Sequence, residues 1–148
     1  MKVRSVHERT LTASPAEVGA LLDDPDRMWP RDRWPALGPE GIGFLRHVPL
    51  DHQPGGPRRF RITGPSGFTG WHGWEVAANG ATMLRHVVEA ECRGWARLAW
   101  PLVIRPIHNA MHEDVLDRAE AVLGSGRPPT REWPRRVRFL RWAIRKGR

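Results

Sequence analysis

The chain has 148 residues and a single cysteine, Cys92, so it is long enough for one domain with its own core and cannot form an internal disulfide. Its longest apolar run, residues 98–104, is far shorter than the about 20 residues that a membrane span needs. The N-terminus lacks the apolar segment of a secretory signal. These features predict a soluble cytoplasmic protein.

The net charge of +8 is concentrated at one end of the chain. Residues 127–148 contain nine Arg or Lys and one acid, Glu132, whereas residues 1–126 contain fifteen basic and fifteen acidic residues. The sequence therefore does not support a basic face covering the whole domain. We expect residues 1–126 to form the folded domain, and residues 127–148 to form a basic linker and a short amphipathic helix.

The first third of the chain predicts one strand and two short helical segments. Residues 3–12 are expected to form a strand, although their alternation does not show which face is buried. The sequence Ser-Pro-Ala-Glu at residues 14–17 combines an N-cap serine, a proline at the first helical position and the glutamate of a capping box. Residues 23–25 end this helix, and a second short turn runs through residues 28–29.

Turn residues divide the middle of the chain into an antiparallel meander. Glycine and proline cluster at residues 53–57 and at residues 64–67, and these clusters separate stretches rich in apolar and aromatic residues. The expected strands are residues 41–50, 59–62, 68–77, 82–92 and 95–100.

The two longest of these strands form a hairpin whose register can be derived. The apolar side chains of the two strands lie on the same face of the sheet only under one condition. For each pair of residues that face each other, the two residue numbers must add to an even number. A three-residue loop ending at Gly80, with Gly80 in the left-handed region, meets this condition and pairs Ala77 with Ala81. His72 then lies directly opposite His86 on the inner face, with Cβ atoms about 5 Å apart.

A long helix is predicted over residues 101–123, because apolar residues recur there every three or four positions. Pro106 leaves two starting points open: near Leu102 with a distortion at Pro106, or at Pro106 itself. The apolar stripe is Ile104, Ile107, Met111, Val115, Ala119 and Val122, and acidic residues, including Asp117, fall on the opposite side. A short basic helix is predicted over residues 134–146.

This order of elements predicts an α+β fold, a curved antiparallel sheet of six or seven strands wrapped around a long C-terminal helix, with two short helices after the first strand. Over residues 3 to about 123 the chain resembles the START-like, or SRPBCC, superfamily of helix-grip proteins, which includes pollen allergens, lipid-transfer domains and aromatic polyketide cyclases. The matching motifs are ASPAEV at 13–18, LDDP at 22–25, WP at 29–30, GFTGWH at 67–72, WEV at 74–76, TMLRH at 82–86 and WPL at 100–102.

The resemblance implies a cavity between the concave face of the sheet and the long helix. It implies no particular catalytic residue, because the superfamily has no universal catalytic side chain. The residues expected to bind a ligand are Trp29, Trp34, Phe60, Phe68, His72, Trp74, Leu84, His86, Val88, Leu98, Trp100, Ile107, Met111 and Val115. The alternative is that these side chains fill a core, with Trp29 and Trp34 packed under a loop and not at a cavity mouth.

Two pairs of histidines are candidates for chemistry. His72 and His86 are candidate catalytic residues that could bind a phenol or carboxylate, or move a proton in an aldol condensation and dehydration; the alternative is a hydrogen-bonded core pair. A metal site at this pair would need a third ligand, and none is evident. His108 and His112 lie four apart on the expected helix, a spacing that could bind metal, but no HExxH motif accompanies them. We therefore expect no metal and no cofactor.

Three functions are compatible with these features. The first is binding of a hydrophobic or aromatic small molecule, lipid or polyketide-like, in the cavity. The second is an aromatic polyketide cyclase/dehydrase that uses the inner histidines. The third is an adaptor that binds an anionic membrane surface or nucleic acid through residues 127–148. The oligomeric state is open, and a homodimer is one possibility.

Overall fold

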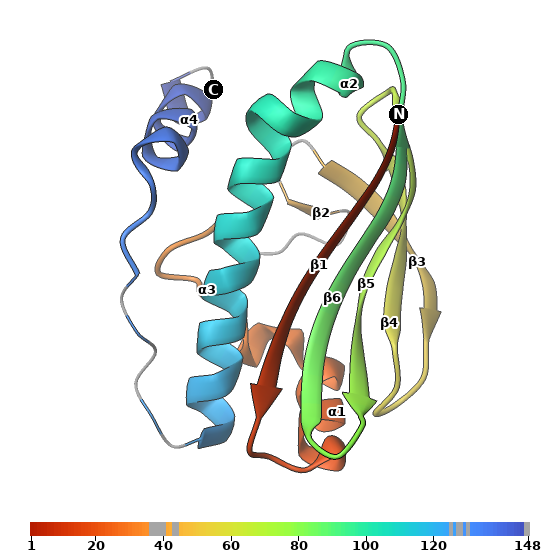
Figure 1. Ribbon diagram of the computed structural model, residues 1–148, viewed down its shortest axis with the longest axis vertical. Helices are drawn as coiled ribbons and strands as arrows, with labels where there is room; N and C mark the ends of the chain where they lie inside the picture. The colour runs from red at the N-terminus through yellow and green to blue at the C-terminus, as the bar shows by residue number, and fades with distance from the viewer. Residues whose placement is uncertain (36–40, 43–44, 125, 127–128, 130, 147–148) are drawn as a thin grey trace.

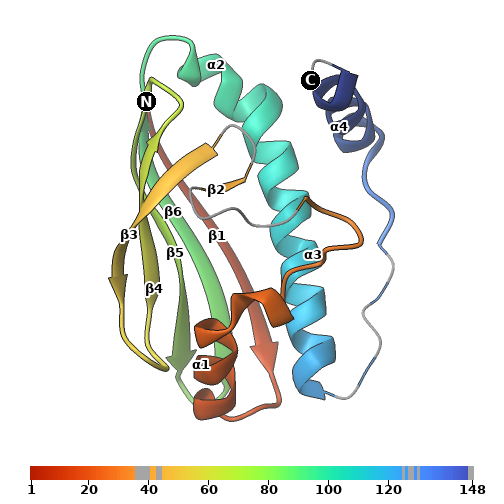
Figure 2. The same cartoon turned by 180° about the vertical axis from the view of Figure 1, so that it is seen from behind.

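A curved antiparallel sheet lies along one side of a long helix in the computed structural model of this chain (Figure 1). The structure describes residues 1–148 except 36–40, 43–44, 125, 127–128, 130 and 147–148. Strand order in the sheet is β1-β6-β5-β4-β3-β2, and all neighbouring strands are antiparallel. Figure 2 shows the short helix α1 closing one end of the space between the sheet and the long helix.

The sheet has five long strands, fewer than the six or seven predicted. A sixth strand, β2, is a two-residue edge segment, and the expected strand over 41–50 is divided between β2 and β3, with residues 43–44 outside the described part of the chain. The strands are β1 Lys2–Leu11, β2 Gly41–Ile42, β3 Leu45–His52, β4 Arg58–Gly64, β5 Phe68–Ala78 and β6 Thr82–Cys92.

The strand predicted over residues 95–100 is wrong, because this segment is already helical. Helix α2 (Ala96–Ala99), a π-helical turn (Trp100–Ile104) and helix α3 (Arg105–Gly124) form 29 consecutive helical residues. The helix thus starts at Ala96, before both predicted starting points, which were near Leu102 and at Pro106. A stretch of six residues is too short to distinguish strand alternation from a helical face, and Gly94, at φ +54°, turns the chain directly out of β6.

The π-helical turn is explained by a proline and by a contact from the C-terminal helix α4 (Arg135–Lys146). Pro106 has no N–H to donate to the carbonyl of Leu102, and the wider turn also leaves the Pro101 carbonyl without its usual partner. Arg136 Nη2 donates to both oxygens, at 3.1 Å to Pro101 and 2.7 Å to Leu102. The basic helix therefore docks where the long helix lacks internal hydrogen bonds.

Helix α1 (Pro15–Asp23) begins as predicted. Ser14 Oγ accepts from the Glu17 amide, and a carboxylate oxygen of Glu17 accepts from the Ser14 amide at 2.8 Å. A 3-10 turn follows at Pro25–Arg27. The helix packs closely on the β3–β4 turn, because a Cβ at Gly19 would lie 2.6 Å from the Gly55 carbonyl oxygen.

In the β5–β6 hairpin each side chain lies on the predicted face of the sheet, but the pairing of the two strands differs from the predicted one. Ala78 pairs with Thr82, so paired numbers sum to an even number, and Gly80 has the expected positive φ of 82°. The loop starts one residue later than expected. His72 therefore faces Val88, and His86 is its diagonal neighbour.

Two buried acids on helix α3 face the C-terminal segment. Asp114 accepts from Trp34 Nε1 at 2.7 Å and from Trp133 Nε1 at 2.9 Å. Asp117 pairs with Arg9 at 2.9 Å and accepts from Arg131 Nη2 at 3.0 Å. Asp117 lies on the side of the helix opposite the predicted apolar stripe, yet it is only 2% exposed. Arg9 of β1 and Arg131 of the C-terminal segment cover it there.

The hydrophobic core consists of two clusters with histidines between them. One cluster surrounds α1 and includes Leu84 of β6 and Val115 of α3, while the other includes Val88 of β6 and Ile104 of the π-helical turn. His86 lies between Leu84 and Val88 along the same inward face. Within the described residues, no helix is both long and apolar enough to cross a membrane.

Candidate functional site

A cavity of about 360 Å³ lies between the sheet and the long helix. Strands β3 to β6 supply one wall, the segment after α1 supplies a second, and the long helix supplies the third. Its wall is mainly apolar and aromatic, with histidines on both the sheet side and the helix side. The lining residues are Asp24, Pro25, Asp26, Met28, Trp29, Leu45, His47, Pro49, Arg58, Phe60, Ile62, Phe68, His72, Trp74, His86, Val88, Trp100, Ile104, His108, Met111, His112 and Val115.

Ten of the fourteen residues expected to bind a ligand line this cavity: Trp29, Phe60, Phe68, His72, Trp74, His86, Val88, Trp100, Met111 and Val115. The other four do not. Leu84 is fully buried in the core, and Trp34 is buried against Asp114. Ile107 packs against the cluster around α1, and Leu98 is 67% exposed because its segment is helical.

Three histidines, from β3, β5 and β6, form a chain along the sheet side of the cavity. His47 Nδ1 lies 2.8 Å from His72 Nε2, and His72 Nδ1 lies 3.3 Å from His86 Nε2. Each contact shares one proton, so one ring donates and the other accepts. His47 also stacks on Phe60, with ring centroids 4.4 Å apart. The predicted pairing of His72 with His86 is therefore realised as a diagonal contact within a longer chain.

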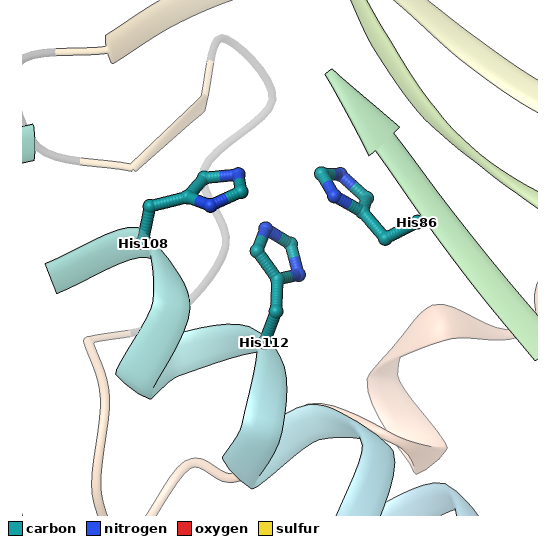
Figure 3. Close-up of side chains that lie close together, drawn as sticks. All are labelled: His86, His108 and His112. Atoms are coloured by element: carbon teal, nitrogen blue, oxygen red, sulfur yellow. The ribbon is translucent and has the colours of Figure 1, made fainter. Parts of the chain in front are cut away.

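Two histidines of helix α3 extend this group across the cavity. His108 and His112 are one helical turn apart, and their ring centroids are 4.1 Å apart. The ring of His112 stacks on that of His86 at 3.6 Å. Figure 3 shows the three rings pointing into a common space, His86 from β6 and the other two from α3. We call His47, His72, His86, His108 and His112 the histidine cluster.

Three members of the histidine cluster have the arrangement of a metal site. His86, His108 and His112 each offer a ring nitrogen, and no two of these atoms are more than 4.8 Å apart. The sequence treated the sheet histidines and the helix histidines as two separate pairs. Packing of the helix on the sheet brings His86 of the first pair together with both members of the second.

Burial keeps the histidine cluster neutral. Burial, together with a smaller contribution from nearby histidines, lowers the pKa of His72 and of His108 to about 3. Burial also lowers the pKa of His86 and of His112 well below the ordinary value. The pKa of the half-buried His47 is lowered as well. At neutral pH each ring therefore offers one N–H donor and one nitrogen acceptor.

Sequence reasoning missed several lining residues, most notably His47 on β3. Leu45, His47 and Pro49 alternate toward the cavity, and this period of two was available in the sequence. His7 on β1 was also missed. Its ring lies 5.5 Å from that of His108, and its Nε2 is 3.2 Å from Asn109 Oδ1. The middle of the inward face of β1 is polar, with Ser5, His7 and Arg9, so hydrophobic alternation carried no signal there.

The sequence matches no protein-family model. No curated protein is similar enough in sequence to count as a relative.

Solved structures share the fold at low sequence identity. The di-domain ARO/CYC StfQ from the steffimycin biosynthetic pathway is 15% identical with a TM-score of 0.59, covering 84% of this chain and 52% of that one. Ara h 8.0201 is 15% identical with a TM-score of 0.58, covering 85% and 100%. A putative uncharacterized protein from Rhizobium leguminosarum is 19% identical with a TM-score of 0.52, covering 84% and 96%. This chain therefore has a helix-grip fold.

Proposed function

We propose that this protein binds a largely apolar, aromatic small molecule in the cavity between the sheet and the long helix, and that it is a START-like helix-grip protein. The observation that carries the proposal is the cavity itself. Its volume of about 360 Å³ lies at the lower end of the about 300–1,000 Å³ typical of small-molecule sites. A mostly apolar wall with few polar groups is the usual composition of such sites.

The aromatic character of the ligand follows from the wall. Trp29, Phe60, Phe68, Trp74 and Trp100 present rigid aromatic surfaces to the cavity. Offset or edge-to-face contacts between aromatic rings contribute about 0.5–1.5 kcal/mol beyond their buried area. An aromatic ligand therefore gains more from this wall than a flexible acyl chain of equal area.

The polar part of the ligand would meet the histidine cluster. Neutral imidazoles can donate to a carbonyl or carboxylate and can accept from a phenol. His47 and His72 are the members nearest the open edge of the sheet, on β3 and β5. A phenol or carbonyl group at one end of an aromatic ligand fits this combination.

A cyclase or dehydrase is the second candidate, favoured by the chain from His47 to His86. Two of the structurally similar proteins are described as ARO/CYC di-domains from biosynthetic pathways. A general base works best when its pKa lies near the working pH. The pKa of about 3 for His72 makes it a weak base at neutral pH, so binding ranks above catalysis. Replacing His72 and His86 by Phe should abolish turnover if the protein is an enzyme.

An adaptor role for residues 127–148 receives less support. Trp133 and Arg136 make contacts with the long helix, and Val137 is buried. The described part of this segment therefore has a structural use within the chain.

Fluorescence titration tests the proposal, because Trp29, Trp74 and Trp100 line the cavity. We expect saturable quenching by polycyclic phenols, with weaker binding of fatty acids. Val88→Phe places a larger side chain in the cavity and should weaken binding at least tenfold. Val48→Phe is the matched control, since Val48 lies on β3 and is 44% exposed.

Equal affinity of the two variants for every bound phenol would contradict the proposal. So would the absence of binding by any member of the panel to the folded wild-type protein. Circular dichroism should show that both variants are folded, which separates loss of the cavity from loss of structure.

A further inference from the structure

The three histidines that meet across the cavity have unused ligand atoms. His86 Nδ1, both ring nitrogens of His108, and His112 Nδ1 are buried and have no hydrogen-bond partner within the described residues. Buried polar atoms in folded proteins are nearly always satisfied, and an exception calls for a missing partner. Four such atoms in one place indicate a partner that is not part of the chain.

We propose that His86, His108 and His112 bind one divalent transition-metal ion, with an open coordination position facing the cavity. Imidazole nitrogen is a ligand of choice for Zn²⁺, Fe²⁺, Ni²⁺ and Cu²⁺ and is not one for Ca²⁺ or Mg²⁺. Three protein ligands with one position left free is the arrangement of catalytic zinc sites, whereas structural sites are closed by four. This proposed metal site does not depend on whether the cavity also binds an organic ligand.

The geometry needs only a modest adjustment. Zn–N bonds of about 2.0–2.1 Å in a tetrahedral site place ligand nitrogens roughly 3.4 Å apart. The nitrogens of the three rings are at most 4.8 Å apart. Rotation of the rings about their side-chain bonds closes this difference, with His112 leaving its stacked position on His86. The backbone already supplies the framework, because residues four apart on a helix share one face.

The surrounding residues suit a metal-bound His86. A ligating histidine usually donates its second ring N–H to a partner that fixes its orientation. With Nδ1 of His86 on the ion, its Nε2–H donates to His72 Nδ1, and His72 Nε2–H then donates to His47 Nδ1. The observed distances of 3.3 Å and 2.8 Å allow both bonds. Binding would thus assign a single tautomer to each ring of the chain.

Neutral imidazoles are the form that binds metal, and burial favours this form for all three rings. The cavity leaves room for a water or for an oxygen or nitrogen atom of a bound molecule as the fourth ligand. An ion held here would make that atom more acidic or more polarised. The site therefore adds a Lewis acid to a cavity lined by aromatic residues.

Titration of the tag-free, chelator-stripped protein with Zn²⁺ or Co²⁺ alone tests the proposal. Calorimetry should show one high-affinity ion per chain, and Co²⁺ should give the intense visible absorption of a low-coordinate site. His108→Leu and His112→Leu should each weaken binding by about 100-fold or more. His52→Gln is the matched control, because His52 lies outside the histidine cluster and pairs with Asp23.

Binding that is equally strong in His108→Leu, His112→Leu and His52→Gln would overturn the proposal, as would no stoichiometric binding by the wild type. X-ray absorption of the zinc-loaded wild type needs no variant. Three imidazole nitrogens around the ion would support the site, and one or none would overturn it. Because the probe is the ion alone, failure here leaves the proposed aromatic ligand untouched.

Discussion

Helix α3 carries buried polar residues on two sides, and the two sides are satisfied differently. On the outer side, Asp114 and Asp117 each have at least two partners from other parts of the chain. On the inner side, His108 has no hydrogen-bond partner among the described residues. His112 Nδ1 is equally without one.

The difference separates structural polar groups from groups available to a ligand. A buried polar group that holds the fold together needs its partner within the chain, because leaving it unsatisfied costs about 1–3 kcal/mol. The inner histidines bear this cost without compensation from the chain. Proteins commonly give up stability in this way at binding sites.

The largest expected effect comes from removing an outer acid. Asp117→Leu deletes a carboxylate that pairs with Arg9 and Arg131, and it leaves the guanidinium of Arg9 without this partner. Breaking a buried ion pair usually costs about 3–5 kcal/mol. Because Arg131 is half exposed, we expect a loss of about 3 kcal/mol in the free energy of unfolding. Urea denaturation followed by circular dichroism measures it, and a loss below 1 kcal/mol would contradict the structural role.

The next largest expected effect is a loss of stability at acid pH, which comes from the buried histidines that line the cavity. In the metal-free protein His72 and His108 have pKa values of about 3, against about 6.5 when unfolded. Below pH 6.5 the unfolded chain therefore binds protons that the folded chain does not, so stability falls as pH decreases and stops falling near pH 3.

Each of these two histidines should lower the free energy of unfolding by roughly 1.4 kcal/mol for each pH unit below 6.5. Lowering the pH from 7.5 to 5.5 should thus reduce the free energy of unfolding by about 2–3 kcal/mol through these two residues alone, and the lowered pKa of His86 and of His112 acts in the same direction. Urea titrations at the two pH values provide the measurement. The double variant His72→Phe, His108→Leu should lose the about 2–3 kcal/mol that these two residues contribute, and an unchanged pH dependence in that variant would contradict their role.

The smallest effect is expected for His112→Leu, the inner counterpart of Asp117→Leu. The new side chain is the same, the helix is the same, and both original residues are buried. Removing an unsatisfied polar group in favour of an apolar one of similar volume is nearly neutral or stabilising. We expect the free energy of unfolding to rise or to change by less than about 1 kcal/mol. A loss of more than 2 kcal/mol by the same urea assay would show that His112 is structural.

The sequence predicted the fold because its signals were local. The capping box at Ser14 and Glu17 located helix α1, and Gly80 set the parity of the β5–β6 hairpin. The parity decides which face each side chain of this hairpin occupies. Five of the expected residues on it therefore line the cavity despite the register error: Phe68, His72, Trp74, His86 and Val88. The segment around Leu98 failed because six residues cannot distinguish a strand from the start of a helix.

The histidine cluster could not be assembled from local signals. The i, i+4 spacing of His108 and His112 was visible, but their approach to His86 depends on how the helix crosses the sheet. The burial of Asp117 was equally hidden, because Arg131 reaches it from a segment that looks like a linker. Contacts between distant parts of a chain are set by packing, which one sequence without structure does not report.

Native mass spectrometry of the protein purified from its own host shows whether the cavity facing the inner side of α3 holds a molecule from outside the chain. We expect a reproducible mass excess that denaturation releases as an apolar aromatic compound, lost in Val88→Phe and retained in Val48→Phe. An empty wild-type protein that also takes up no phenol or fatty acid in solution would contradict this expectation.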